Sequence, residues 1–293
     1  MMPGFLYKYQ QFRKEMETPV VKHQNPEILE RLQKMIQPFV LRRTKKEVLK
    51  ELPDKIERIM SAVMEGEQRE LYDAHVQRLQ MQLAKQSDEE FRTSKIEILA
   101  ELTRLRQVCC DPSLLYADYR GQAAKMDLCM ELVESAVQAG HKILLFSQFT
   151  SMLDHITQEL TKREISWYLL TGHTAKKERV QMAEAFNQDD TSVFCISLKA
   201  GGTGLNLTGA DIVIHFDPWW NAAAETQAED RAHRIGQKEV VTVYKLIAKN
   251  SLEEKIVQLQ ARKKELASQV LGGDGIQEAS FSREELLELL ENH

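Results

Sequence analysis

Two arginines and a glutamine are spaced so that one helix face would present all three to a phosphate. They lie in the segment QAEDRAHRIGQ, which begins at Gln227. On a helix, Gln227, Arg231 and Arg234 stand at i, i+4 and i+7 and share a face. A guanidinium keeps its charge and can donate two parallel N–H bonds, so this face suits a polyphosphate whose terminal charge grows during transfer. The alternative is a solvated helix face on which Glu229 and Asp230 pair with the arginines.

A glycine-rich segment, SLKAGGTGLN (residues 197–206), begins where a strand is expected to end. Glycines let backbone amides approach an anion, and open α/β sheets bind ligands at the carboxyl ends of their strands. One alternative is a tight turn that needs glycine. Another is a dinucleotide site, with Gly202 and Gly204 opening the fingerprint and Asp217 ending the next strand. Against the dinucleotide site, the third glycine position is Leu207, and only six residues follow Gly204 before the next expected strand.

Two adjacent tryptophans follow that next strand, in the segment DPWWN (residues 217–221). Exposing two large aromatic rings in a loop is costly. Because adjacent side chains diverge, we expect one of Trp219 and Trp220 to be buried. The other would be free to wedge against a sugar or a base. The alternative is that both rings cover the end of the sheet as a hydrophobic cap.

The segment from Arg31 to Arg58 is basic, although the whole chain has a net charge of −5. It holds nine lysines and arginines against four acidic residues, a local net charge of +5. Contact with a nucleic-acid backbone is one interpretation, and a solvated charged surface is the other. The nine basic residues are Arg31, Lys34, Arg42, Arg43, Lys45, Lys46, Lys50, Lys55 and Arg58.

Several signatures are missing, and their absence excludes classes of function. The sequence has no GxxxxGK(S/T) phosphate loop and no Asp-Glu-x-His, so by itself it should not hold Mg²⁺ and the β- and γ-phosphates of a nucleotide. It has no GxSxG nucleophile elbow and no paired-carboxylate site. Its four cysteines form no CxxC pair and have no histidine at finger-like spacing. We therefore expect reduced thiols and no metal site.

The composition is that of an ordinary globular protein, with 43% hydrophobic and 28% charged residues. A length of 293 residues suggests about two domains. No run approaches the ~18 apolar residues of a membrane span. The first 14 residues lack the apolar core of a signal peptide, so we expect neither a membrane contact nor export.

The elements that must position these residues alternate between strand and helix from about residue 125 to 250. The expected strands are apolar throughout, which indicates burial on both faces, and helical crossovers between them indicate a parallel sheet. Strands are expected at 142–147, 165–170, 192–197, 211–216 and 240–247, with helices at 150–162 and 175–187.

The two ends of the chain read as helical. Helices are expected at 67–86 and 93–108, joined by a polar loop at 86–90, and Cys109 and Cys110 should end the second of them. Asn25 and Pro26 should begin an earlier helix that Pro38 interrupts. After residue 250, an apolar stripe from Leu252 to Val270 predicts a helix ended by Gly272 and Gly273, and a short last helix is expected at 282–291.

Together these segments resemble the second RecA-like lobe of the SWI/SNF-type family of DNA-dependent ATPases, in helicase superfamily two. The resemblance covers nearly the whole chain. PFVLRRTK (38–45) with ELPDK (51–55) resembles the family's opening segment, and LRQVC (105–109) its next helix-end motif. ILLFSQF (143–149), residues 197–206 and residues 227–237 resemble motifs IV, V and VI. Two departures are Thr171, where the family has an acidic residue before glycine, and CCDP (109–112) in place of Cys-x-His-Pro.

The resemblance implies roles residue by residue. Arg231 and Arg234 would be arginine fingers on ATP, supported by Gln227 and Asp230. The other implied nucleotide contacts are the backbone near Gly201 and, as weaker candidates, Lys199, Gly202, Gly204 and Asn206. The implied DNA contacts are Ser147, Gln148, Ser197, Thr171, Gly172, Asn221 and Trp220, the last rather than Trp219.

The resemblance also implies the architecture. We expect an α/β fold with a RecA-like parallel sheet sandwiched by helices. Residues 1–120 would hold the linker from a first lobe and a helical protrusion, residues 121–250 the RecA-like lobe, and residues 251–293 bracing helices.

The implied function is the C-terminal lobe of an ATP-dependent double-stranded DNA translocase. ATP would bind with Mg²⁺ held by the first lobe of a longer parent protein, and a protein–DNA complex could be the substrate. The isolated chain would be inactive. A cytoplasmic or nucleoid-associated protein, bacterial or archaeal, is favoured. The alternatives are a DNA- or protein-binding module without catalysis, and a small-molecule enzyme that uses Gly202 and Gly204.

Overall fold

The computed structural model describes residues 8–21, 25–36, 38, 52–198, 200, 204–271, 287 and 289–290. The chain divides into two units. One comprises residues 1–50 with 258–279, and the other comprises residues 51–257 with 280–293.

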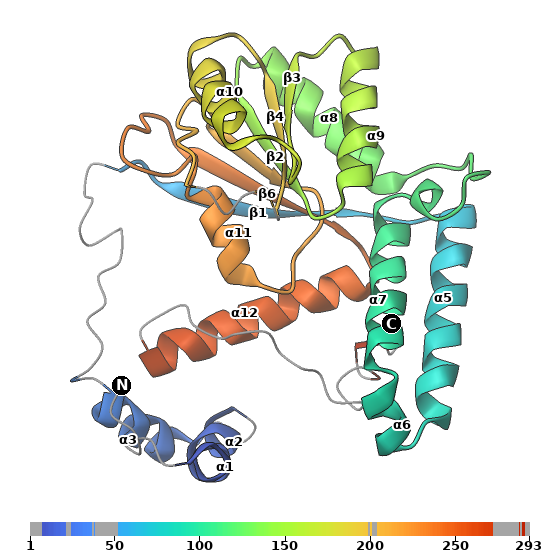
Figure 1. Cartoon of the computed structure of the whole chain (residues 1–293), viewed down its shortest axis with the longest axis vertical. Helices are drawn as coiled ribbons and strands as arrows, with labels where there is room; N and C mark the ends of the chain where they lie inside the picture. Colours follow the sequence, from blue (N-terminus) through green and yellow to red (C-terminus); the bar gives the residue numbers. More distant parts are fainter. Residues whose placement is uncertain are drawn as a thin grey trace. The chain divides into compact units, whose positions relative to one another are not determined.

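The larger unit is built on a six-stranded parallel sheet with the order β1-β6-β5-β2-β4-β3 (Figure 1). The five strands expected from the sequence are confirmed within two residues at each end. The strands are β1 (Lys55–Ala62), β2 (Ile143–Ser147), β3 (Trp167–Leu170), β4 (Val193–Ser197), β5 (Ile212–His215) and β6 (Val241–Ala248). Because all strands are parallel, their carboxyl ends meet at one edge of the sheet, where the motif segments begin.

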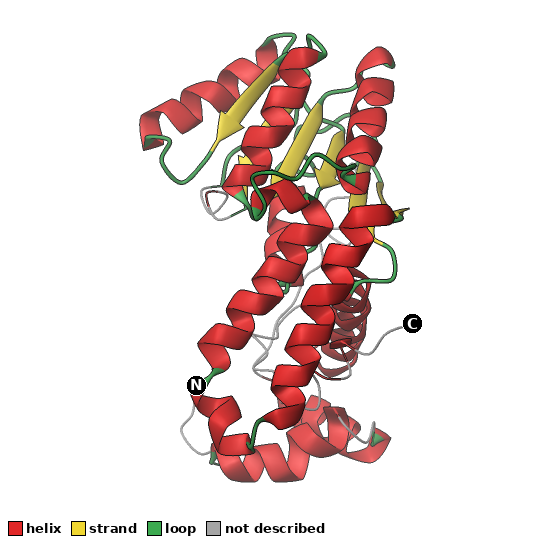
Figure 2. Ribbon diagram, turned by 90° about the vertical axis from the view of Figure 1, so that its right-hand side faces the viewer, coloured by secondary structure: helices red, strands yellow, loops and turns green. Residues whose placement is uncertain are grey.

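Both faces of the sheet are covered by helices, as the continuous apolar strands predict (Figures 1 and 2). Successive strand residues alternate between two buried clusters: Leu145 packs with α8 (Ala124–Gln138) and α9 (Thr150–Lys162). Leu144 and Phe146 pack on the other face with α10 (Lys176–Gln188) and α11 (Ala222–Glu229). The expected RecA-like α/β sandwich is confirmed.

The strand β1 was not expected from the sequence. It lies at the edge of the sheet and pairs in parallel with β6, from Lys55 opposite Val241 to Ala62 opposite Ala248. An edge strand is not buried on both faces, so KIERIMSA carries charges that hide its β character. The segment expected to hold only linker and helices therefore also contributes one strand to the sheet.

A helical hairpin precedes the sheet's central strands. It consists of α5 (Gly66–Lys85) and α7 (Lys95–Cys110), which run side by side (Figure 2). Between them, residues 88–93 form the short helix α6 (Asp88–Thr93) instead of the expected loop. The reason is a capping box: Ser87 accepts from the backbone N–H of Glu90, whose carboxylate accepts from the backbone N–H of Ser87.

The helices of the smaller unit begin with α1 (Tyr9–Phe12), a π-helical turn (Arg13–Glu17) and α2 (Thr18–Val21). The helix α3 (Pro26–Ile36) begins as expected, since the side-chain oxygen of Asn25 accepts hydrogen bonds from the backbone N–H groups of Glu27 and Ile28. It ends at Ile36, two residues before Pro38.

The expected C-terminal helix is confirmed as α12 (Leu252–Leu271), whose residues divide between the two units. Gly272, Gly273 and most of the short helix expected at 282–291 lie outside the described residues. Leu289 and Leu290 are helical and buried, and the side-chain amide of Gln80 on α5 donates to the carbonyl oxygen of Leu290 at 2.6 Å.

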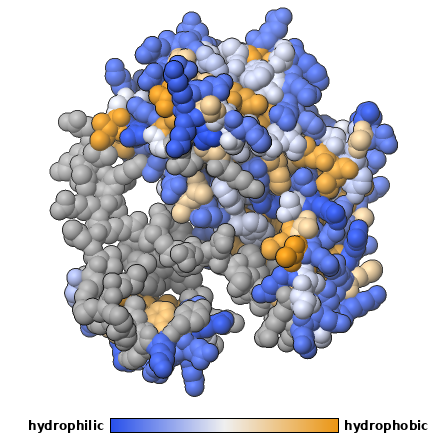
Figure 3. All heavy atoms as spheres, viewed as in Figure 1, coloured by the Kyte–Doolittle hydropathy of each residue, from blue (hydrophilic) through white to orange (hydrophobic). Residues whose placement is uncertain are grey.

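All four cysteines are buried and free, and α7 ends at Cys110 as expected. Within the described residues, no group of histidine, cysteine and acidic side chains could hold a metal ion. The described helices also include none with the length and apolarity that crossing a bilayer requires. Hydrophilic side chains cover most of the coloured surface in Figure 3, with small apolar patches between them.

Candidate functional site

The arginine segment does not form one helix face, so the expected i, i+4, i+7 arrangement is wrong. The helix α11 ends at Glu229, and Arg231 and Arg234 lie in the turns that follow. In a continuing helix the carbonyl oxygen of Arg231 would accept from the residue four positions later. It accepts instead from the backbone N–H of Leu207, at 3.0 Å. The residue that follows the glycine-rich segment thus supplies a donor in place of a helical one, and the chain turns at this point.

Arg231 is only 6% exposed, and charged side chains are rarely buried to this extent. Its Nε and Nη1 atoms are buried and have no hydrogen-bond partner among the described residues. Burial lowers the pKa of its guanidinium to about 10, so the group stays charged at neutral pH. A buried, unpaired charge costs folding free energy, and an anion on these two nitrogens would remove that cost. The residues present therefore fit a phosphate.

The other members of the expected nucleotide site are more exposed. Gln227 lies on the last turn of α11 and Arg234 in the following turn, both facing solvent, while Asp230 is half-buried at the end of the helix. Glu229 does not pair with the arginines, because it binds Lys55 instead.

Part of the glycine-rich segment, with Lys199, Gly201 and Gly202, lies outside the described residues. Gly204 and Asn206 are exposed. The side chain of Asn187 on α10 holds the segment, donating to the carbonyl oxygen of Asn206 and accepting from the backbone N–H of Gly209, both at 2.9 Å. A Cβ at Gly209 would lie 3.0 Å from the Cα of Asn187, so a larger residue there would push Asn187 away.

Asp217 is fully buried and joins the end of β2 to the loop after β5. It accepts hydrogen bonds from the Ser147 hydroxyl and from the side-chain amide of Gln148, both at 2.5 Å. Asp217 is therefore occupied and cannot bind the ribose of a dinucleotide. Ser147 and Ser197 are 0% and 2% exposed, so burial leaves their side chains no surface for the expected DNA contact. Gln148 remains partly accessible.

Arg106, on α7, completes this buried cluster. It is 3% exposed, and its Nη1 donates to the side-chain oxygen of Gln148 at 2.7 Å. Its Nη2 donates to the carbonyl oxygen of Pro218 and lies 3.6 Å from a carboxylate oxygen of Asp217. In the sequence, Arg106 stands out only as part of a helix-end motif. The sequence feature that could have indicated its role is an arginine among the apolar residues of LRQVC.

Both tryptophans are half-buried, so the expectation that one would be buried is wrong. Trp219 packs on the cluster between the sheet, α10 and α11, and its backbone N–H donates to Glu225 at 2.6 Å. The ring of Trp220 lies against the guanidinium of Arg106, 5.8 Å from the centroid to Cζ. Asn221 caps α11, accepting from the backbone N–H of Ala223.

The turn at Thr171 and Gly172 is held by Arg179, a residue that sequence analysis did not single out. The guanidinium donates to the carbonyl oxygens of Thr171, Gly172 and Thr174 at 2.8 to 3.3 Å. A further bond, at 3.2 Å, reaches the carbonyl oxygen of Ala200, within the glycine-rich segment. One side chain therefore links the expected DNA-contact turn to the expected nucleotide segment. The helix α10 begins at 176, one residue later than expected.

An ionic cluster beneath α11, between that helix and the strands β1, β5 and β6, was not predicted from the sequence. Its members come from these four separate elements. The carboxylate of Glu229 lies 2.5 Å from Nζ of Lys55 on β1, 3.4 Å from His215 on β5 and 3.9 Å from Lys245 on β6. Burial by itself raises the pKa of Glu229, but these neighbours outweigh it and bring the pKa to about 2. Lys245 also binds Glu225, at 2.9 Å. Lys55, which belongs to the basic segment, therefore forms an ion pair within the protein.

The histidine of the family's Cys-x-His-Pro motif is replaced by Asp111, which has a local structural role. One carboxylate oxygen accepts from the backbone N–H of Ser113 at 2.8 Å, and the other lies 3.2 Å from Nδ1 of His155 on α9. Asp111 therefore caps the 3₁₀ turn Pro112–Leu114 and ties it to α9. Arg42, Arg43, Lys45, Lys46 and Lys50 lie outside the described residues.

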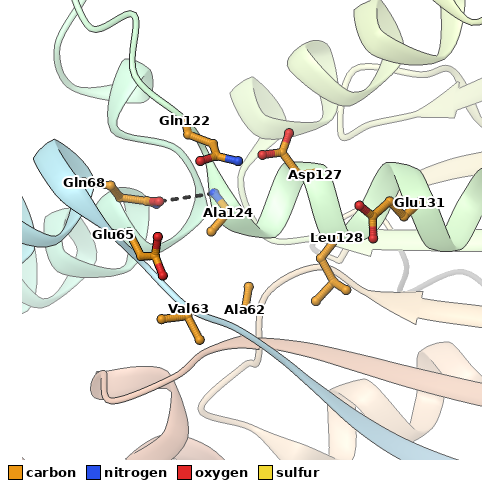
Figure 4. Close-up of a pocket in the computed structure, with 9 residues that line it drawn as sticks. All are labelled: Ala62, Val63, Glu65, Gln68, Gln122, Ala124, Asp127, Leu128 and Glu131. Atoms are coloured by element: carbon orange, nitrogen blue, oxygen red, sulfur yellow. Dashed lines mark hydrogen bonds between the residues drawn. The ribbon is translucent and has the colours of Figure 1, made fainter.

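A pocket of about 280 Å³ opens beside the end of β1 and the first turns of α5 and α8 (Figure 4). Its lining includes the acidic residues Glu65, Asp127 and Glu131. Gln68 uses both ends of its amide, donating to a main-chain carbonyl and accepting from the backbone N–H of Ala124. Carboxylates repel phosphates, so this pocket is unsuited to a nucleotide.

Two family models match this chain. One, described as the helicase conserved C-terminal domain, matches residues 124–236, and the other, described as the SNF2-related domain, matches residues 1–114. An ATP-dependent helicase of Mycoplasma pneumoniae is 38% identical over 292 residues, which make up 99% of this chain. The chain spans 28% of the length of that relative.

Solved structures agree with these matches. The C-terminal domain of the Sulfolobus solfataricus SWI2/SNF2 ATPase is 34% identical, with a TM-score of 0.61, over 75% of this chain and 91% of that one. The SWI2/SNF2 ATPase core of the same organism, in complex with double-stranded DNA, is 36% identical with a TM-score of 0.62. That match covers 91% of this chain and 56% of the other. The resemblance seen in the motifs is thereby confirmed: the chain belongs to the SNF2-type family of helicase superfamily two.

Proposed function

We propose that this chain is the C-terminal lobe of an ATP-dependent motor that translocates along double-stranded DNA. The observation that carries the proposal is the buried guanidinium of Arg231, which keeps two nitrogens without a partner among the described residues. A charge held in this way is unfavourable until an anion reaches it. A terminal phosphoryl group, which gains negative charge during transfer, is the ligand that best repays this cost.

In this proposal ATP binds between this lobe and a first lobe, which supplies the phosphate-binding loop and the Mg²⁺ ligands. Arg231 and the exposed Arg234 act as arginine fingers when the lobes close, with Gln227 and Asp230 beside them. Lys199, Gly201, Gly202, Gly204 and Asn206 are the remaining nucleotide contacts that we propose. Since closure alone completes the site, this chain should not hydrolyse ATP by itself.

The DNA contacts that we propose are on the same edge of the sheet. Gln148, Trp220 and Asn221 lie close together after β2 and β5, and Thr171 with Gly172 follows β3. Support comes from the structural relative solved with double-stranded DNA. Ser147 and Ser197 are assigned a positioning role, because both are buried. The substrate could include protein bound to the DNA, in the cytoplasm or on a nucleoid.

The test is ATP hydrolysis by the motor that contains this chain together with a first lobe, with and without double-stranded DNA. We expect DNA to stimulate hydrolysis, the 293-residue chain alone to be inactive, and Arg231→Lys in the motor to remove the activity. A motor that hydrolyses no ATP with any nucleic acid would overturn the proposal.

A DNA- or protein-binding module without catalysis would then be the better description, and a salt titration of DNA binding would distinguish its two forms. Contacts with phosphates give an affinity that falls steeply with salt, whereas a lobe that binds only protein would show no DNA affinity to titrate.

A further inference from the structure

We propose that Arg106 is a positioning residue for DNA engagement, which holds Trp220 and Gln148 in their DNA-facing arrangement. The inference rests on the proposed function, since it deepens the role of the loop after β5. It assigns that role to a side chain on α7, more than 100 residues earlier in the sequence and outside the motifs expected to touch DNA.

The guanidinium of Arg106 lies where three segments meet. Its Nη1 donates to Gln148, just after β2, and its Nη2 donates to Pro218, in the loop after β5. The aromatic rings of Phe149 and Trp220 each lie with their centroids 5.8 Å from its Cζ, close enough for cation–π contact. Arg106 is therefore in contact with two of the three segments that carry the proposed DNA contacts, those after β2 and β5.

Asp217 makes this arrangement specific. Its carboxylate accepts from Ser147 and from Gln148, and one oxygen lies 3.6 Å from Nη2 of Arg106. The amide of Gln148 is thus fixed at both ends, with its nitrogen on Asp217 and its oxygen on Arg106. A buried ion pair of this kind adds little net stability, but it selects one arrangement of the groups around it.

Only a planar, forked donor can make all of these contacts at once. A guanidinium donates in two directions in its plane while its faces rest on aromatic rings. A lysine ammonium would keep the charge opposite Asp217 but could not bridge Gln148 and Pro218 while stacking on Trp220. Because Arg106 is 3% exposed, it cannot itself be a major contact for a DNA phosphate. Its effect on DNA must pass through the residues that it holds.

The position of Trp220 can be measured without ATP or DNA, because the chain has only three tryptophans. The variant Trp167→Phe/Trp219→Phe leaves Trp220 as the one emitter, and Trp167→Phe/Trp220→Phe leaves Trp219. With Arg106→Lys added, we expect acrylamide quenching of Trp220 to rise and its emission to shift to the red. Quenching of Trp219 should stay unchanged, since its ring packs against the cluster between the sheet, α10 and α11.

The matched control is Arg104→Lys, on the same helix. Arg104 is half exposed and donates to Glu101, one turn away, so it should alter neither tryptophan. If Arg106→Lys fails to fold, Gln148→Leu removes the acceptor of Nη1 and leaves the charge pair with Asp217. It should raise the quenching of Trp220 in the same way. Equal changes at Trp219 and Trp220 would show that Arg106 only stabilises the fold, and would overturn the inference.

DNA binding gives a second, independent readout, measured by fluorescence anisotropy on labelled duplex in the chain with all three tryptophans. We expect Arg106→Lys to weaken binding roughly tenfold, the scale of one lost stacking contact. The slope of log affinity against log salt should not change, because no phosphate contact is lost. In Arg106→Gln, which also removes the positive charge, a slope reduced by about one would instead make Arg106 a direct phosphate contact and overturn the inference.

The two proposals fail separately. If the wild-type motor neither binds nor responds to duplex DNA, the proposed function fails, and with it the role of Arg106 in DNA engagement. Selective exposure of Trp220 would still establish that Arg106 positions this loop. If DNA binds but Trp220 is unaffected by Arg106→Lys, the proposed function stands and the inference about Arg106 is overturned.

Discussion

The backbone N–H of Leu207 donates a 3.0 Å hydrogen bond to the carbonyl oxygen of Arg231. This bond joins the residue that follows the glycine-rich segment to the turn after α11 that carries Arg231. It replaces the helical bond that would have continued α11, so the position of the guanidinium depends on its neighbouring segment rather than on the helix. A change in the glycine-rich segment can therefore move Arg231 without touching it.

The buried charge of Arg231 predicts opposite effects on stability and activity. In Arg231→Met, the free energy of unfolding of this chain should rise by about 1 kcal/mol, because the change replaces a buried charge, two of whose nitrogens have no partner among the described residues, by an apolar side chain of similar length. ATP hydrolysis by the motor should be lost. Urea denaturation and a steady-state ATPase assay measure the two effects.

Arg234→Ala is the matched comparison, since Arg234 is exposed in the same turn. It should abolish DNA-stimulated hydrolysis while leaving the free energy of unfolding within about 0.5 kcal/mol of the wild type. DNA binding should be nearly intact in both variants. Destabilisation by Arg231→Met would mean that the guanidinium of Arg231 has an internal partner. Unchanged ATP turnover in either variant would exclude the substituted arginine from the ATP site.

The two adjacent tryptophans should separate coupling from stability. Trp220→Ala is expected to reduce the distance moved along duplex DNA per ATP hydrolysed more than it reduces ATP affinity, because the ring is proposed to contact DNA. Trp219→Ala should instead lower the free energy of unfolding by about 2 kcal/mol, since that half-buried ring packs against the core. A triplex-displacement assay with a parallel ATPase measurement gives the coupling. Equal movement per ATP in Trp220→Ala would contradict the assignment.

The ionic cluster beneath α11 predicts how stability depends on pH. The folded-state pKa of Glu229, about 2, lies below its ordinary value of 4.5. Its contribution to stability is therefore complete above pH 4.5 and is lost as the pH falls toward 2. A shift of this size corresponds to about 3 kcal/mol.

Glu229→Gln should accordingly lower the free energy of unfolding at pH 7 by about 3 kcal/mol and flatten its decline between pH 5 and pH 2. Urea titrations across this pH range would show both effects. Glu184→Gln, at an exposed position on α10, should change neither quantity. If Glu229→Gln keeps the wild-type pH dependence, other carboxylates control acid unfolding.

The central strands could be predicted from the sequence because they are buried on both faces. The run from Ile143 to Phe146 is wholly apolar, and it forms a strand in the middle of the sheet. The edge strand β1 mixes charged and apolar residues without strict alternation, since Glu57 and Arg58 are adjacent, and that pattern did not distinguish it from a linker. The helix α6 was predictable in principle, because Ser87 and Glu90 have the spacing of a capping box.

The candidate site was predictable in its residue types and less so in its geometry. The motifs placed Arg231 and Trp220 in the proposed site by their order along the chain. They could not show that α11 ends early, since the competing hydrogen bond comes from Leu207, 24 residues away. Nor could they show that Arg106 reaches Gln148, because a contact across 42 residues leaves no local pattern.

The guanidinium of Arg179 donates to four main-chain carbonyls in two loops. Lysine could satisfy only part of this set. Since each lost hydrogen bond costs about 1 kcal/mol, Arg179→Lys should lower the free energy of unfolding by about 2 kcal/mol. It should also weaken DNA binding, because the turn at Thr171 and Gly172 loses its support. Denaturation and anisotropy titrations measure the two effects.

Arg163→Lys is the appropriate control, because it also replaces a forked donor, but one that binds Glu134 and Glu159 on the surface. It should change the free energy of unfolding by less than about 1 kcal/mol and leave DNA binding intact. Destabilisation by Arg179→Lys with unchanged DNA affinity would show that the turn at Thr171 and Gly172 does not contact DNA. Loss of DNA-stimulated hydrolysis together with DNA affinity would indicate that Arg179 links the DNA-contact turn, through Ala200, to the nucleotide segment.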